Sequence, residues 1–114
     1  MKDEQAIEAE IQAKGKTAPR ITPADIDATI AGEYFVQPIK WESVPVTEGM
    51  KCLTICILSL RNGFTVIGES ACASPENFDE ELGMKIAREN ARAKIWPLEG
   101  YRLKQQLYDE GRPF

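Results

Sequence analysis

One cysteine and a row of carboxylates are the residues in this chain whose types and spacing suit chemistry. Cys72 lies just before Ser74, which suits the start of a helix, and a thiol near a helix N-terminus can become a nucleophile. The sequence contains no histidine, so no imidazole base is available to activate that thiol. We therefore interpret Cys72 as a packing residue.

Four carboxylates, Glu76, Asp79, Glu80 and Glu81, follow within the same segment. Consecutive positions of a helix point in different directions, so these groups are not expected to converge on one ion. They suit the first turn of a helix, where negative charge offsets the helix dipole. We predict no catalytic residues, no metal site and no cofactor, and we interpret the chain as a non-enzyme.

A row of cations is the main candidate for ligand binding. Lys85, Arg88 and Arg92 fall on one face of the predicted helix, and Arg61 at a hairpin tip extends the row. Such a row can follow phosphates, with binding that weakens steeply in salt. The alternatives are an ordinary solvated surface, a nucleic-acid site, or a sponge for small anionic nucleotides at a dimer seam. The net charge of −4 opposes a protein devoted to nonspecific phosphate binding.

A β-hairpin is the strongest local pattern. Asn62-Gly63 is the preferred pair for a two-residue type I′ turn, which would place Ser59 opposite Val66. That register gives one face with Leu53, Ile55, Ile57, Phe64 and Val66, and another with Cys52, Cys56, Leu58, Leu60 and Ile67. Both faces are too apolar for a half-exposed sheet. Either helices cover both, or Cys56, Leu58, Leu60 and Ile67 form a homodimer interface.

Two helices frame the predicted strands. Thr22 suits an N-cap followed by Pro23, with Gly32 as the stop and an extended segment over residues 33–39. Ser74 and Pro75 favour the start of the main helix, which Pro97 ends or bends. Its apolar stripe is Phe78, Leu82 and Ile86, beside the small residues Gly83, Ala87 and Ala91, and a last helix is predicted over residues 98–108.

The element order predicts an α+β fold: a small antiparallel sheet built on a central hairpin with helices packed on it, in the order α-β-β-β-α-α. With 114 residues the chain suits a single domain over residues 20–110, with a polar, disordered lead over 1–19 and a free tail over 111–114. A helix of the lead that orders only against a partner is the alternative. No apolar run approaches a membrane span, and we expect a soluble, intracellular protein.

Longer motifs carry a family resemblance. The run from Arg61 to Asp79, RNGFTVIGESACASPENFD, resembles the Gp-forty-nine-like family of small proteins from tailed bacteriophages and prophages. The segments KIARENA and KIWPLEGY, and ITPADI upstream, fit the same family, so the resemblance covers roughly residues 20–108. It implies a small accessory phage product in the cytoplasm of the infected bacterial host, and it brings no catalytic residues with it.

The expected function is therefore binding. The leading hypothesis is a non-enzymatic phage protein that binds a host or phage protein, for host takeover or counter-defence. The sequence identifies neither the partner nor the oligomeric state.

Overall fold

The computed structural model describes residues 3–16 and 18–112. From the second helix onward the order is α-β-β-β-α-α, so the predicted α+β fold is confirmed. The contacts divide the chain into two compact units, one holding Ile30–Arg92 and the other holding the described residues before and after it. The helices and strands are α1 (Glu4–Ala13), α2 (Pro23–Thr29), β1 (Ile30–Val36), β2 (Leu53–Leu60), β3 (Thr65–Ala71), α3 (Glu80–Ala93) and α4 (Ile95–Asp109), with short 3₁₀ turns η1 (Pro38–Lys40), η2 (Met50–Cys52) and η3 (Pro75–Asn77).

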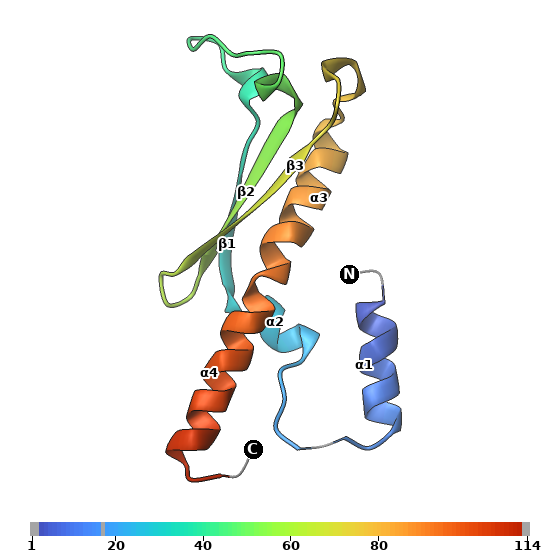
Figure 1. Cartoon of the computed structure of the whole chain (residues 1–114), viewed down its shortest axis with the longest axis vertical. Helices are drawn as coiled ribbons and strands as arrows, with labels where there is room; N and C mark the ends of the chain where they lie inside the picture. The colour runs from blue at the N-terminus through green and yellow to red at the C-terminus, as the bar shows by residue number, and fades with distance from the viewer. Residues whose placement is uncertain (1–2, 17, 113–114) are drawn as a thin grey trace. The chain divides into compact units, whose positions relative to one another are not determined.

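The N-terminal segment differs from the disordered lead that its sequence predicts, because residues 4–13 form α1 (Figure 1). The helix ends at Ala13, and Gly15, just past the C-cap Lys14, has a φ of 66° that suits glycine. There the amide of Gly15 donates to the carbonyl of Gln12 and that of Lys16 to Ile11, a Schellman motif. The lead and the tail also include residues 1–2, 17 and 113–114, which lie outside the described residues, and the single-domain boundaries stay a prediction.

A bidentate ion pair connects α1 to the segment that follows it. The Arg20 guanidinium donates to both carboxylate oxygens of Glu8, each at 2.7 Å, and the pair is partly buried. This contact, helped by the amide of Gln12, lowers the pKa of Glu8 to about 2. The charged form is thus favoured by an interaction that spans twelve residues of sequence, which helical periodicity cannot reveal.

We expect Glu8→Gln to loosen α1. Because the pKa of Glu8 is lowered in the folded state, its stabilisation is present above the unfolded-state pKa and is lost as the pH falls toward about 2. Amide hydrogen exchange at neutral pH should therefore speed up across residues 4–13 in Glu8→Gln. The control is Glu10→Gln, which removes only an exposed pair with Lys14 one turn away. Equal exchange in the two variants would contradict the role of the Glu8–Arg20 pair.

The cap of α2 follows the sequence. The Thr22 hydroxyl accepts from the Asp25 amide at 3.1 Å, and the Asp25 carboxylate accepts from the Thr22 amide at 2.9 Å. This reciprocal capping box fixes the start of the helix. Its end comes earlier than Gly32, because Ile30 already pairs with Leu60 as the first residue of β1.

The sheet of the unit Ile30–Arg92 has three antiparallel strands in the order β1-β2-β3. Its β2–β3 register differs by one residue from the prediction: Leu58, not Ser59, lies opposite Val66. The loop has three residues, Arg61 to Gly63, closed by the Leu60 amide bonding to the carbonyl of Phe64 at 2.8 Å. Gly63 has a φ of 90° whereas Asn62 has no positive φ, so the predicted type I′ turn is wrong. A glycine after a type I turn suits this longer loop.

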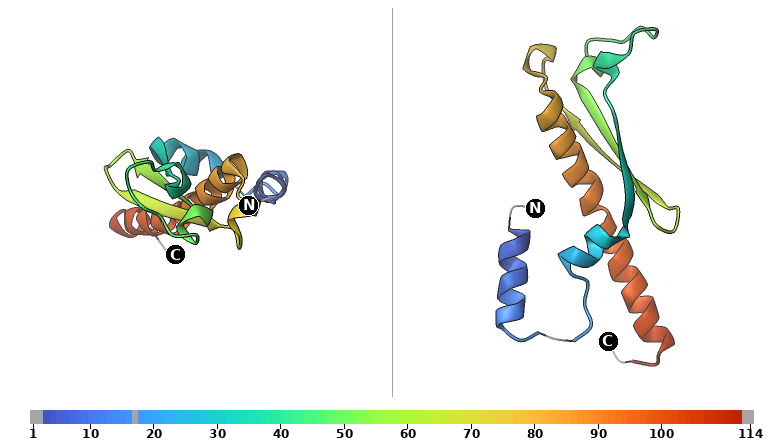
Figure 2. Two further views of the ribbon diagram at one scale, coloured as in Figure 1. Left: turned by 90° about the horizontal axis from the view of Figure 1, so that it is seen from above. Right: turned by 180° about the vertical axis from the view of Figure 1, so that it is seen from behind.

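The register change moves every side chain of β3 to the other face of the sheet. Thr54, Cys56, Leu58 and Leu60 of β2 are buried on one side, together with Val66 and Gly68 of β3. Helix α3 lies along this side of the sheet in both figures (Figures 1 and 2). It is the only α-helix within residues 30–92, so the unit itself covers one face of its sheet.

Helix α3 approaches the sheet through its small residues. A Cβ added to Gly68 would lie 2.2 Å from the Ala87 carbonyl oxygen and 2.2 Å from the Ala91 amide nitrogen. A Cβ on Gly83 would lie 2.6 Å from the Thr54 hydroxyl oxygen. Ala87 and Ala91 are fully buried. Backbone-to-backbone packing this close leaves no room for larger side chains at the seam.

The predicted apolar stripe of α3 consequently faces outward. Leu82 is 53% exposed and Ile86 is 40% exposed. The start of the helix also differs, since Ser74 and Pro75 open η3 and the Asp79 carboxylate caps α3 by accepting from the Leu82 amide at 3.0 Å. Phe78, in an extended conformation, separates the two.

Two polar contacts fix α3 along the sheet. Buried Gln37 donates from its side-chain amide to the Thr54 hydroxyl and to the Glu80 carbonyl, each at 3.1 Å. Near the other end, the Asn90 side-chain amide donates to the Glu69 carbonyl at 2.7 Å. These bonds satisfy polar groups and set the position of α3 along its axis.

Candidate functional site

Helix α3 holds three of the four predicted phosphate-binding cations. Lys85 is exposed, whereas Arg88 and Arg92 are half-buried, and Arg61 lies in the β2–β3 loop. The Arg88 guanidinium donates to the Glu33 carboxylate of β1 at 2.6 Å. A phosphate at Arg88 would therefore compete with an existing carboxylate partner. The use of these cations for nucleic acid or nucleotides stays a prediction.

The predicted homodimer residues do not share one surface. Cys56 and Leu58 are fully buried and Leu60 is 8% exposed, all on the side of the sheet along which α3 lies. Ile67 is 46% exposed and lies on the opposite side, where Ile57 pairs with it. The three buried residues were grouped with Ile67 only because the expected register was one residue off. Cys56, Leu58 and Leu60 belong to the core between sheet and helix, and of these four residues Ile67 alone lies on the surface.

The exposed side of the sheet is instead largely apolar, and we call its apolar residues the open face. Tyr34 is 61% exposed there and pairs with Ile57, which in turn pairs with Ile67. Such alternation of buried and half-exposed residues along β2 is typical of a sheet with one covered side. The open face consists of Tyr34, Val36, Leu53, Ile55, Ile57 and Ile67.

A second feature is a pair of thiols beside a small cavity. A cavity of about 160 Å³ lies where β3 leads into η3, and Cys52, Cys72 and Phe78 line it. Cys52 is buried and Cys72 is partly exposed. Burial and the neighbouring Cys72 thiol raise the pKa of Cys52. Burial also raises the pKa of Cys56, with a further contribution from Glu33.

The predicted carboxylate row is distributed among structural contacts. Glu76 accepts from the Ser74 hydroxyl at 2.6 Å, Asp79 caps α3, and Glu80 pairs with Lys40 of η1. Across the described residues, no cluster of three or more His, Cys, Asp or Glu side chains could hold a metal ion. Three of the four carboxylates, Glu76, Asp79 and Glu80, therefore make structural contacts at the start of α3 or just before it.

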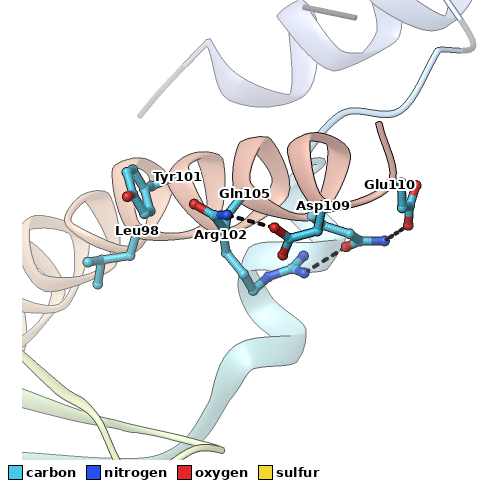
Figure 3. A pocket seen from close by; sticks show the side chains of 7 residues that line it. Leu98, Tyr101, Arg102, Gln105, Asp109 and Glu110 are labelled. Atoms are coloured by element: carbon cyan, nitrogen blue, oxygen red, sulfur yellow. Dashed lines mark hydrogen bonds between the residues drawn. The ribbon is translucent and has the colours of Figure 1, made fainter. Parts of the chain in front are cut away.

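Helix α4 carries a shallow depression along its own surface, shown in Figure 3. Its lining residues belong to this one helix and its C-cap, Glu110, and several of them bond to each other one turn apart. Arg102 donates to Gln106 at 3.1 Å, and Gln105 donates to Asp109 at 2.9 Å. A surface built by one helix cannot enclose a ligand, so the depression is not a binding site. No helix in the described part of the chain is long and apolar enough to cross a membrane.

Sequence reasoning missed the open face and the neighbouring thiols for the same reason. Both depend on the β2–β3 register, which the Asn62-Gly63 pair indicated incorrectly. The types of residues at the paired positions of β2 and β3 could have indicated the observed register. In the observed register Cys56 and Leu58 oppose Gly68 and Val66, a compact set that suits close cover by a helix.

The comparisons with known proteins agree with the resemblance of the motifs. A family model described as phage protein (N4 Gp49/phage Sf6 gene 66) matches residues 21–107, which include α2, the whole sheet and α3. A search of curated proteins and a search of solved structures return no match. Because the matched range spans most of the sequence, the chain belongs to the phage protein (N4 Gp49/phage Sf6 gene 66) family.

Proposed function

We propose that this phage protein acts by binding another protein through the open face of its sheet, without performing chemistry itself. The partner would be a host or phage protein, and the setting the cytoplasm of the infected bacterium, for host takeover or counter-defence. The observation that carries the proposal is the side-by-side exposure of apolar residues on all three strands. Contiguous exposed apolar surface of this kind is typical of interaction sites.

Several properties of the open face support a protein as the ligand. Its side chains are held by a hydrogen-bonded sheet, so little conformational entropy is lost when a partner covers them. Tyr34 contributes an aromatic ring with a polar end, a combination that is frequent at interaction hot spots. One charged side chain, Glu69 of β3, lies opposite Ile55 and projects to the same side of the sheet. A flat, apolar surface suits another folded protein better than a phosphate group.

The test uses two matched substitutions. Ile67→Asp places a carboxylate on the open face, and Leu82→Asp places the same group on a position of α3 that is comparably exposed. Tagged wild type and both variants serve as bait in lysates of uninfected and infected bacteria. We expect wild type and Leu82→Asp to retain a protein partner, and Ile67→Asp to bind it at least tenfold more weakly, as loss of a hot-spot contact would.

Three outcomes would overturn the proposal. Partner retention by Ile67→Asp at the level of Leu82→Asp would exclude the open face. Recovery of nuclease-sensitive material that leaves in moderate salt would favour the nucleic-acid alternative through Arg61, Lys85, Arg88 and Arg92. A dimer in light scattering that Ile67→Asp converts to a monomer would make the open face a self-interface.

A further inference from the structure

Cys52 and Cys72 lie directly opposite each other at the end of the β2–β3 ladder. The last paired residues of the ladder are Leu53 and Ala71, so the next pair in the same register is Cys52 with Cys72. The Cys72 amide donates to the Cys52 carbonyl at 3.2 Å, which marks this as a hydrogen-bonded pair. Such pairs have Cα atoms about 5.5 Å apart, within the range that a disulfide spans.

The two sulfur atoms share one environment. Both side chains line the 160 Å³ cavity, and the turns that carry Cys52 and follow Cys72, η2 and η3, pack against each other. The Cys72 thiol donates to the Ser74 carbonyl at 3.2 Å and lies 3.7 Å from the Cys52 carbonyl oxygen. Residues directly opposite in an antiparallel pair project to the same face. The thiols are therefore adjacent without any change of fold.

We propose that Cys52 and Cys72 are a modification site, a dithiol that a peroxide oxidises reversibly to a disulfide. The Cys72 sulfur attacks one oxygen of hydrogen peroxide, the O–O bond breaks, and a sulfenic acid and water form. The Cys52 sulfur then attacks the Cys72 sulfur, the S–O bond breaks, and a second water leaves. Two thiols lose two electrons and two protons in total, and one peroxide is reduced to two waters.

The order of the two steps follows from exposure. Cys72 is partly exposed at the cavity, whereas Cys52 is 6% exposed and its pKa is raised, so the peroxide reaches Cys72 first. Cys52 then acts as the resolving thiol. In a reducing cytoplasm such a bond is transient, and reversal by a dithiol reductant is part of the proposal.

Cys56 is excluded from the reaction by its position. It lies four residues from Cys52 along β2, roughly 13 Å away at strand spacing, and the same offset along the ladder separates it from Cys72. Its side chain is fully buried. The structure thus selects one of the three conceivable pairs.

The experiment treats the folded full-length protein with hydrogen peroxide, removes the oxidant, denatures the protein and alkylates it with iodoacetamide. Mass spectrometry should find all cysteines alkylated before oxidation and only Cys56 alkylated afterwards, with a peptide crosslink between Cys52 and Cys72 that dithiothreitol removes. Cys56→Ser should form the same crosslink. Cys52→Ser should leave a sulfenic acid on Cys72 that dimedone labels.

Several results would overturn the proposal, and the first three need no variant to fold. These are a crosslink that includes Cys56, a crosslink only between two chains, or alkylation of Cys52 and Cys72 that peroxide leaves unchanged. Dimedone labelling of Cys52 in Cys72→Ser at the rate seen for Cys72 in Cys52→Ser would contradict the assigned order of steps.

Discussion

Replacing Gly68 with alanine is expected to destabilise the protein by about 3 kcal/mol, because the added methyl group would overlap the backbone of α3. The new Cβ would lie 2.2 Å from both the Ala87 carbonyl oxygen and the Ala91 amide nitrogen. Neither atom belongs to a side chain that could rotate away. The helix must therefore move from the sheet, and the buried contacts of Leu58 and Val66 beneath it would loosen. The free energy of unfolding in urea, followed by circular dichroism, measures the loss.

The matched control is the same substitution at Gly100. That glycine lies inside α4, and a Cβ there would meet no other atom within 4 Å. Alanine has the higher helix propensity, so Gly100→Ala should stabilise the protein by about 0.5–1 kcal/mol. Opposite signs for the two variants would support the close approach of α3 at Gly68. A neutral Gly68→Ala would contradict it.

The second large effect is expected from two neighbouring residues of β2 that point to opposite sides of the sheet. Leu58 is fully buried under α3, whereas Ile57 belongs to the open face. Leu58→Asp would bury an unpaired charge at a cost of about 3–5 kcal/mol, besides the lost packing of the leucine. That sum is comparable to the whole stability of about 5–15 kcal/mol of an ordinary domain. Leu58→Asp should therefore lack cooperative folding.

Ile57→Asp, its control, should remain folded, since the carboxylate reaches solvent. Circular dichroism and the dispersion of amide signals in NMR distinguish the two variants directly. A folded Leu58→Asp with native-like dispersion would mean that the side of the sheet under α3 is accessible. Loss of folding in Ile57→Asp alone would reverse the assignment of the two faces.

The order of the elements was predictable because local patterns dictate it. Thr22 with Pro23 marks a helix start, and alternating apolar residues around Asn62-Gly63 mark two strands. The register was not predictable, since the same dipeptide serves a two-residue turn and the last positions of a three-residue loop. Pairing of β1 with β2 and the close contact of Gly68 with α3 decide between them, and both are tertiary.

The orientation of α3 shows a similar limit. Its largest apolar side chains suggest a core stripe, yet the helix turns Ala87 and Ala91 inward and leaves Leu82 and Ile86 on its exposed side. Periodicity identifies candidate faces, but the distance between helix and sheet selects among them. The contact of residues 4–13 with the rest of their unit was likewise beyond a local pattern, because Glu8 meets Arg20 twelve residues away.

The candidate sites follow from these tertiary features. The open face becomes visible only when β3 is placed in the correct register, and so does the pairing of Cys52 with Cys72. The sequence contains three cysteines, and an odd number argues against a framework of permanent disulfides. That count does not bear on a single reversible disulfide.

The contact between Asn90 and Glu69 affects how the free edge of the sheet could pair with another strand. Hydrogen-bonded pairs alternate along β2–β3, so the carbonyl of Glu69, opposite Ile55, points away from β2 toward the free edge of the sheet. The side-chain amide of Asn90 donates a hydrogen bond to that carbonyl at 2.7 Å. A second molecule that added a strand to β3 could not use this carbonyl as an acceptor, which disfavours edge-to-edge association of sheets. The outer strand of the sheet is thus partly protected against strand addition, although one side of the same sheet exposes apolar residues.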